Sequence, residues 1–175
     1  MEHICKNLEH FKSLITINFS GNNFSVNTCR ILGLFVTSSY SLRDIDIAHC
    51  RISYQGTRYI IDALNRNTMI RQFNFAFNDL TSSAYEFSIK IASIITRHPS
   101  LMHLDISKTN LKREETLFIG LALSTSKTIL SIHLTANELP YYERIFLRSV
   151  IAARCGFEFR NLASKKAVKS NKERN

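Results

Sequence analysis

The chain has 175 residues, of which 45% are hydrophobic and 21% are charged, and its formal net charge is +9. This composition is typical of a water-soluble domain, and no apolar run approaches the ~20 residues that would cross a bilayer. The positive charge is concentrated from Arg160 onward, so the chain before it is only mildly basic.

The four cysteines, Cys5, Cys29, Cys50 and Cys155, are scattered along the chain without the paired spacing of a metal or redox motif. The N-terminal sequence MEHICKNLEHF has no basic segment followed by a continuous apolar stretch, so we see no secretory signal. Both observations favour a reducing compartment. We therefore expect free thiols and a cytoplasmic location, where the protein could associate with the cytoskeleton.

One hydrophobic pattern occurs five times. Its copies start at Leu14, Leu42, Ile70, Leu101 and Ile129, so the starts are separated by 28, 28, 31 and 28 residues. Each copy fits the frame apolar-x-x-apolar-x-apolar-x-x-(Asn/Cys/Thr)-x-apolar. This frame at a period of about 20 to 29 residues is the signature of a leucine-rich repeat solenoid.

The first half of each copy alternates like a strand, with the apolar frame positions on one face and the residues between them on the other. The ninth frame position ends the strand. We expect its side chains to turn inward and hydrogen-bond the backbone, since buried backbone groups need partners. This column consists of Asn22, Cys50, Asn78, Thr109 and Asn137. Cys50 is therefore interpreted as a structural residue and not as a nucleophile.

The second half of each copy predicts a helix, approximately over residues 28–38, 56–66, 83–96 and 114–124. Apolar residues recur ten and six positions before each strand, a spacing of four that places them on one helix face. These two columns are Ile4, Leu32, Ile60, Ile91 and Ile119, and Leu8, Val36, Leu64, Ile95 and Leu123. We attribute the three extra residues of the third copy to a longer helix that ends at Arg97-His98-Pro99.

The two ends of the array differ from the middle. Ile4 and Leu8 indicate a leading helix without a strand of its own. The pattern predicts a closing helical cap over residues 140–159, with a sixth strand that starts at Phe157 and fails at Arg160. We therefore expect one repeat domain over residues 1–159, followed by a basic, disordered tail over residues 160–175.

A strand and a full helix repeated at about 28 residues resembles the ribonuclease-inhibitor-like leucine-rich repeat family, over roughly residues 1–157. The resemblance implies an α/β solenoid of about five repeats of 28–31 residues, with a curved parallel sheet inside and helices outside. It also implies protein binding at the concave face of the sheet. Cytosolic relatives act as inhibitors, regulators of small GTPases, actin-filament regulators and sensor arrays, and the sequence does not choose among them.

The side chains that point outward from the strands form the candidate binding surface. Asp44, Asp46 and Asp105 would face a basic or hydrogen-bonding segment of a partner, and Arg43 and Arg71 are the strongest anchor candidates. The alternative is that these are solvated sheet residues. The predicted partner-binding residues are Arg43, Asp44, Asp46, Arg71, Gln72, Asn74, His103, Asp105 and His133.

The sequence contains no motif that indicates catalysis or the binding of a metal or cofactor. Ser131, His133 and Asp105 would be neighbours, but an open sheet offers no oxyanion hole and no pocket that excludes water, so a simple hydrogen bond or ion pair is the better interpretation. The histidines and cysteines lack the spacing of metal ligands, and no glycine-rich phosphate loop is present. We therefore expect neither an enzyme nor a cofactor or metal site.

The sequence thus predicts a non-enzymatic protein–protein interaction module that uses its concave face. The alternative is a structural subunit embedded in a large cytoskeletal or ribonucleoprotein assembly, and a weaker one is a regulator of a small GTPase. Nucleic acid could bind only through the basic tail, for which a solvated extension is the competing interpretation. No transmembrane segment is expected.

Overall fold

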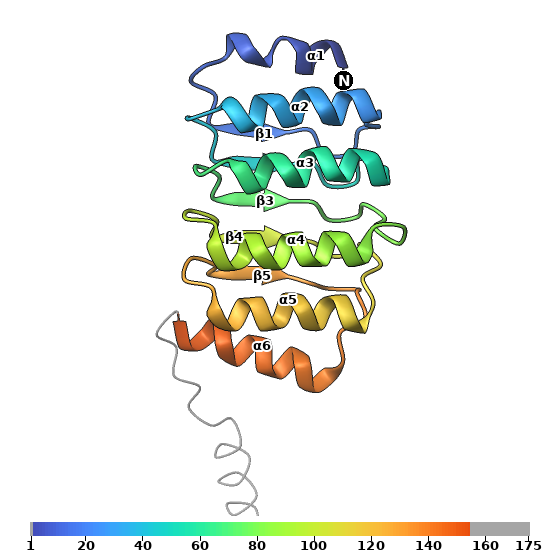
Figure 1. The fold of residues 1–175 in the computed structure, drawn as a ribbon, viewed down its shortest axis with the longest axis vertical. Coiled ribbons are helices and arrows are strands. Elements are labelled where there is room, and N and C mark those ends of the chain that lie inside the picture. Colours follow the sequence, from blue (N-terminus) through green and yellow to red (C-terminus); the bar gives the residue numbers. More distant parts are fainter. Residues whose placement is uncertain (1, 155–175) are drawn as a thin grey trace, which may run out of the picture.

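The fold is a stack of strand–helix units around one parallel sheet. The structure, a computed structural model, describes residues 2–154, and the predicted sixth strand at Phe157 and the basic tail lie outside this range. The five strands follow one another across the sheet in chain order (Figure 1). They are β1 (Thr16–Asn18), β2 (Asp44–Asp46), β3 (Gln72–Asn74), β4 (His103–Asp105) and β5 (Ser131–His133).

The strands pair in the register that the repeat predicts. Asp44 pairs with Thr16 on one side and with Gln72 on the other, and the same alignment continues to His103 and Ser131. Equivalent positions of successive repeats therefore form straight columns across the sheet. This arrangement confirms the predicted fold class, an α/β solenoid of the leucine-rich repeat type.

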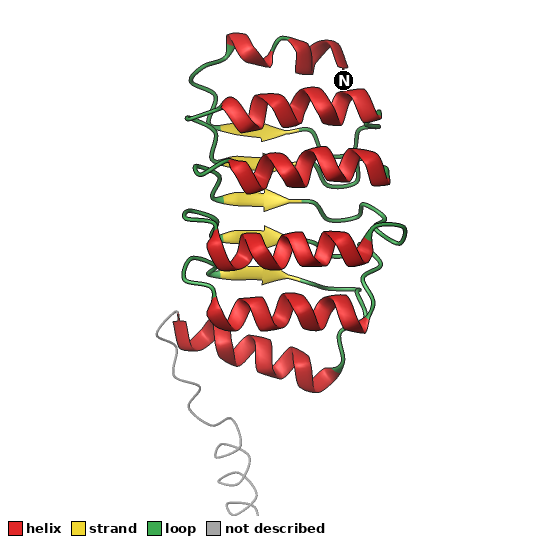
Figure 2. Ribbon diagram, in the orientation of Figure 1, coloured by secondary structure: helices red, strands yellow, loops and turns green. Residues whose placement is uncertain are grey.

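Four helices cover one face of the sheet (Figure 2). They are α2 (Val26–Ser38), α3 (Tyr54–Arg66), α4 (Ala84–Arg97) and α5 (Arg113–Thr125). Serine side chains begin the first two helices, because Ser25 accepts the Thr28 amide at 3.1 Å and Ser53 accepts the Gly56 amide at 3.3 Å. None of the helices in the described part of the chain is long and apolar enough to span a membrane.

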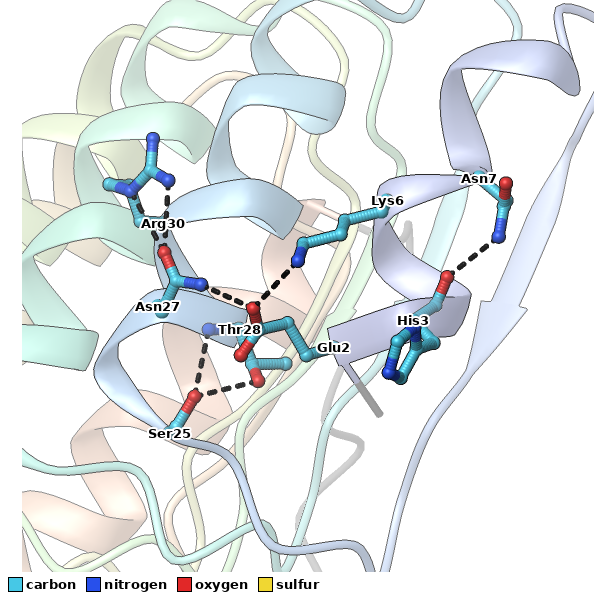
Figure 3. Close-up of polar contacts among 8 residues, drawn as sticks. All are labelled: Glu2, His3, Lys6, Asn7, Ser25, Asn27, Thr28 and Arg30. Carbon is cyan, nitrogen blue, oxygen red and sulfur yellow. Dashed lines mark hydrogen bonds and ion pairs between the residues drawn. The ribbon is translucent and has the colours of Figure 1, made fainter.

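Shorter or tilted helical elements close the two ends of the stack: α1 (Glu2–Lys6) with the 3-10 turn Leu8–His10, and α6 (Tyr141–Arg154). Polar contacts attach α1 to α2. The Glu2 carboxylate accepts the Asn27 side-chain amide at 2.7 Å and pairs with Lys6 at 3.0 Å (Figure 3). The first strand is thus shielded by a small and mostly exposed element.

The core fills the space between the sheet and the helices. The predicted inward strand residues are buried in the central repeats, and the helix columns are buried from Leu32 to Leu123. At the centre, the rings of Phe73, Phe75 and Phe87 follow one another with centroids 5.9 and 5.8 Å apart. One continuous apolar layer therefore joins all repeats, as expected when no single repeat can bury its own face.

The ninth column hydrogen-bonds the backbone as predicted. Asn78 donates to the carbonyls of Ile47 and Phe75, both at 3.0 Å, and accepts the amides of Cys50 and Ile52. The Cys50 thiol, which is fully buried, donates to the Phe19 carbonyl at 3.1 Å. Burial also raises the pKa of this thiol, which agrees with a structural role.

Two expectations about the helices were wrong. Ile4 is 53% exposed, and Cys5 is buried in its place, because Cys5 and Leu8 lie three residues apart on the inner face of the short α1 and the turn that follows. The extra residues of the third repeat also lie mainly elsewhere. α4 has 14 residues against 13 in its neighbours, whereas residues 75–83 form a nine-residue link in place of the usual seven.

A second polar column, missed in the sequence, ends the helices α2, α3, α4 and α5. The side chain at each helix C-cap accepts the backbone amide of the residue that opens the next strand segment, at 2.9 to 3.3 Å. The column consists of Ser39, Asn67, His98 and Ser126. His98 is buried and accepts through Nδ1, while its Nε2 has no hydrogen-bond partner. Burial lowers the pKa of His98, against a smaller opposite effect of the Asn67 backbone.

A third column turns the chain after each strand through a left-handed backbone conformation. It consists of Gly21 (φ 74°), His49 (55°), Phe77 (60°), Lys108 (51°) and Ala136 (59°). Glycine adopts this conformation freely, whereas a residue with a side chain is strained there by about 1–2 kcal/mol. Four of the five repeats therefore keep a strained residue at the same point.

Candidate binding surface

The candidate site is the face of the sheet that the helices leave free, which we call the concave face and define by the outward side chains of β1 to β5. It contains a shallow depression of about 390 Å³. Seven of the nine predicted binding residues line it: Asp44, Asp46, Gln72, Asn74, His103, Asp105 and His133. Thr16 and Asn18 of the first strand also line it and were not predicted, although they occupy the same two columns.

The two predicted arginine anchors lie outside the depression, one residue before their strands. Arg43 is half-buried, and its guanidinium donates to the carbonyls of Tyr40 at 2.9 Å and Leu42 at 3.0 Å. Part of the hydrogen-bonding capacity of the Arg43 guanidinium is therefore used by the loop that precedes its strand. Arg71 is exposed at the next position along the same row.

The central column of the concave face has a structural role that the sequence analysis missed. The side-chain Oδ1 of each of its first four members accepts the backbone amide two residues further on, at 2.9 to 3.1 Å, where the strand ends. The four residues are Asn18, Asp46, Asn74 and Asp105. This local bond is an Asx-type turn, for which asparagine and aspartate are equally suited. The signal was present in the sequence as an Asn or Asp in the same column of four successive repeats.

The carboxylates are also linked between strands. Asp44 accepts the Thr16 hydroxyl at 3.1 Å, and Asp46 accepts the Asn74 side-chain amide at 3.1 Å. Within residues 2–154, no ion pair involves Asp44, Asp46 or Asp105. The concave face therefore holds three aspartates whose orientation is fixed by hydrogen bonds and whose charge is not neutralised by a basic side chain.

The arrangement of Ser131, His133 and Asp105 differs from that of a catalytic triad. Ser131 Oγ lies 3.3 Å from His133 Nε2, but the Asp105 carboxylate accepts the Ser107 amide, and no ion pair joins it to His133 in the described part of the chain. A triad needs the acid on the second imidazole nitrogen. Among the described residues, no cluster of three His, Cys, Asp or Glu side chains could hold a metal ion.

The outer face of the helices carries exposed apolar side chains in its C-terminal half. Tyr85 on α4 and Phe118 on α5 contact each other with ring centroids 6.3 Å apart and are 64% and 43% exposed. Further exposed apolar residues on α4, α5 and α6 are Ile89, Leu117, Leu121, Tyr142, Ile145 and Phe146. Charged side chains lie between α3 and α4, where Lys90 of α4 pairs with Asp62 of α3 at 2.8 Å and with Glu86 of α4 at 3.1 Å.

The sequence matches no protein-family model and no curated protein. Solved structures do share its fold. A tropomodulin C-terminal domain from Caenorhabditis elegans superimposes with a TM-score of 0.74 at 16% sequence identity, covering 87% of this chain and 92% of that one. The leiomodin-1 structure described as actin-binding site 2 gives a TM-score of 0.75 at 11% identity, covering 99% and 96%.

Proposed function

We propose that this chain is a non-enzymatic protein-binding module and that its partner lies on the concave face. The observation that carries the proposal is the set of carboxylates of Asp44, Asp46 and Asp105, which are aligned by the sheet register and have no basic partner among residues 2–154. A pre-formed surface costs little conformational entropy when it binds. Such a surface suits a segment that presents basic or hydrogen-bonding side chains.

We further propose actin as the partner and the cytoskeleton as the location. The support is the similarity, over nearly the whole length of both chains, to a leiomodin-1 structure whose description is an actin-binding site. At 11% identity the similarity transfers no binding residue, so the residues of this chain must be tested directly. The ribonuclease-inhibitor variety of the repeat, suggested by its length, and the regulation of a small GTPase stay predictions.

Co-sedimentation with filamentous actin and fluorescence titration of monomeric actin test the proposal. The variant D44N/D46N/D105N removes three charges. At positions 46 and 105 it keeps the Oδ1 acceptor of the turn, as Asn18 and Asn74 do naturally in the same column, and at position 44 the amide oxygen can still accept the Thr16 hydroxyl. The bond from the Asn74 side-chain amide to Asp46 Oδ2 is lost. We expect the wild-type chain to bind and the variant to bind at least about tenfold more weakly, with no more loss of stability than one part-buried hydrogen bond, about 1 kcal/mol. E114Q, which removes an exposed carboxylate from the outer helix α5, is the control.

Two results would contradict different parts of the proposal. If the wild-type chain binds neither form of actin, actin is the wrong partner. If the wild type and the triple variant bind equally well, the concave carboxylates are not the site, whatever the partner is.

The second candidate function is a structural subunit of a larger assembly, and the exposed apolar side chains of α4, α5 and α6 favour it. Monomeric proteins rarely expose large contiguous apolar patches. The variant I89S/L121S should make the isolated chain more soluble and should prevent its incorporation into such an assembly, measured by gradient sedimentation of cell extracts. Unchanged sedimentation would count against this candidate. Nucleic-acid binding through residues 160–175 stays a prediction.

A further inference from the structure

A row of exposed side chains borders the concave face at the ends of the strands. His49, Phe77 and Lys108 occupy the left-handed position in the second, third and fourth repeats, and each lies three residues after the central column of its strand. The neighbouring residues Ala48, Ala76 and Ser107 have small side chains. The three side chains of the row are exposed and lie outside the lining of the depression.

The three side chains contact one another. The rings of His49 and Phe77 meet edge to face, with centroids 5.9 Å apart and an interplanar angle of 89°. The Lys108 ammonium lies over the Phe77 ring, 4.9 Å from its centroid. Both are recognised attractive geometries for aromatic rings. Phe77 nevertheless remains 50% exposed, so part of its ring is open to a partner.

Folding does not require an aromatic ring at this place. The equivalent position of the first repeat is Gly21 and that of the fifth is Ala136, with nearly the same φ. Phe77 is also not among the side chains that pack against the core. A bulky residue at positive φ is a conformational outlier, and such outliers concentrate at functional sites.

The row also carries positive charge that no acidic side chain of the described residues neutralises through an ion pair. No ion pair within residues 2–154 involves Lys108, whereas Lys112 nearby pairs with Glu138 at 2.7 Å. Asp79 is engaged by the Thr81 hydroxyl and by the Asn110 side-chain amide at 3.0 Å. A partner would therefore meet an apolar ring directly beside an ammonium group that has no carboxylate partner within residues 2–154.

We propose that Phe77 and Lys108 form an anchor for a protein segment in which an apolar side chain stands next to an aspartate or glutamate. The apolar side chain packs on the open part of the Phe77 ring, and the carboxylate pairs with the Lys108 ammonium. Exposed aromatic residues that become buried on binding carry much of the energy of an interface. The anchor lies beside the concave carboxylates, and it does not depend on actin being the partner.

The experiment uses a random peptide library displayed on phage and selected on the immobilised full-length chain. Affinities of the enriched peptides are then measured for the wild type and for F77G, F77N, K108N and A136G. Glycine and asparagine tolerate the left-handed backbone, so F77G and F77N remove the ring without adding strain. D44N/D46N/D105N separates this anchor from the concave carboxylates.

We expect the enriched peptides to share an apolar residue adjacent to Asp or Glu. Their affinity should fall at least about tenfold in F77G and F77N, and K108N should weaken binding and reduce its salt dependence. A136G should bind as the wild type does, and the triple aspartate variant should bind the acidic peptides at least as tightly, because it removes neighbouring carboxylates that repel them. The melting temperatures of F77G and F77N should not fall below that of the wild type by more than a few degrees.

The proposal is overturned if no peptides are enriched, if the enriched peptides lack the acidic residue, or if they bind F77G and F77N as well as the wild type. Loss of binding in the triple aspartate variant, with F77G unaffected, would assign the peptides to the concave carboxylates instead. Failure of actin binding leaves these outcomes unchanged, so the two proposals can fail separately.

Discussion

The side chain of Asn78 holds the backbone of the preceding repeat through Cys50, whose amide it accepts at 3.1 Å while its own amide group donates to Ile47. Asn137 repeats this arrangement toward Thr109, at 3.1 Å, and Ile106, at 2.8 Å. The asparagines are therefore connectors between repeats as well as turn residues. In the first repeat, the Asn22 amide group donates to the carbonyls of Phe19 and Ser20 in its own turn, and its side chain is exposed.

This difference predicts unequal costs for the same substitution. N78A would leave several buried amides and carbonyls without partners and should lower the free energy of unfolding by at least about 2 kcal/mol. N22A acts at an exposed end and should cost less than about 1 kcal/mol. Urea unfolding followed by circular dichroism measures both, and similar losses in the two variants would contradict the connector role.

Two helical glycines, Gly33 and Gly120, predict opposite effects on stability when each is replaced by alanine. A Cβ at Gly33 in α2 would lie 2.9 Å from the Tyr59 carbonyl oxygen of α3, whereas at Gly120 its nearest neighbour is the tip of Leu147, at 3.1 Å. A backbone carbonyl cannot move without separating the helices, so G33A should destabilise the chain by about 1–3 kcal/mol. G120A should be neutral or stabilising by up to about 1 kcal/mol, because alanine favours a helix. Melting temperatures compare the two, and an equal effect would argue against close packing at Gly33.

His98 predicts a pH dependence of stability. Burial lowers its pKa below the ordinary 6.5, so the unfolded chain takes up the proton first as the pH falls. The stability that neutral His98 contributes is therefore present above about pH 6.5 and is lost as the pH falls through the pKa of the folded chain. Protonation also places a hydrogen on Nδ1, which can then no longer accept the Ser100 and Leu101 amides.

The variant H98N isolates this effect, because Asn67 already accepts the equivalent two amides in the preceding repeat. The free energy of unfolding of the wild type should decline more steeply than that of H98N between about pH 7 and pH 5. H103N, which removes a histidine exposed on the concave face, is the control. Parallel curves for the wild type and H98N would show that His98 is not the titrating group.

Two substitutions of Asp46 distinguish the effect of its charge from the effect of its hydrogen bonds on stability. D46A removes the acceptors of both the Ala48 amide and the Asn74 side-chain amide and should cost about 1–2 kcal/mol of stability. D46N keeps the first acceptor and loses the second, so it should cost less than D46A. Chemical denaturation of the two variants decides this. A loss in D46N as large as that in D46A would mean that the bond to the Ala48 amide contributes nothing, and that the charge or the bond from Asn74 stabilises the fold.

The strands, the long helices and the register could be predicted because apolar residues recur in fixed columns from Leu32 to Leu123. Ile4 was assigned to the core incorrectly because column counting assumes a full helix, and the short α1 buries Cys5 instead. The added residues of the third repeat could not be placed from spacing alone, because a loop and a helix of the same total length preserve the same period. Proline at position 99 marked the helix end but not its start.

The candidate site was predictable in position but not in chemistry. Alternation along the strands placed Asp44, Gln72 and His103 correctly in one column. It did not reveal that Asp46 and Asp105 each cap their own turn, or that Arg43 donates to its own loop. Those roles depend on backbone angles, and so does the strained conformation of Phe77, which periodicity does not encode.

The outermost strands, β1 and β5, each have a single paired neighbour within the described chain, and helix contacts are concentrated between adjacent repeats. In such a one-dimensional array, local opening spreads inward from the ends. Amide hydrogens of β3 should then exchange with solvent last, and those of β1 among the first. A partner that lies across β2, β3 and β4 would add little protection to strands that are already the slowest to open, whereas one that reaches β1 would slow exchange there and extend the protected region toward the N-terminus.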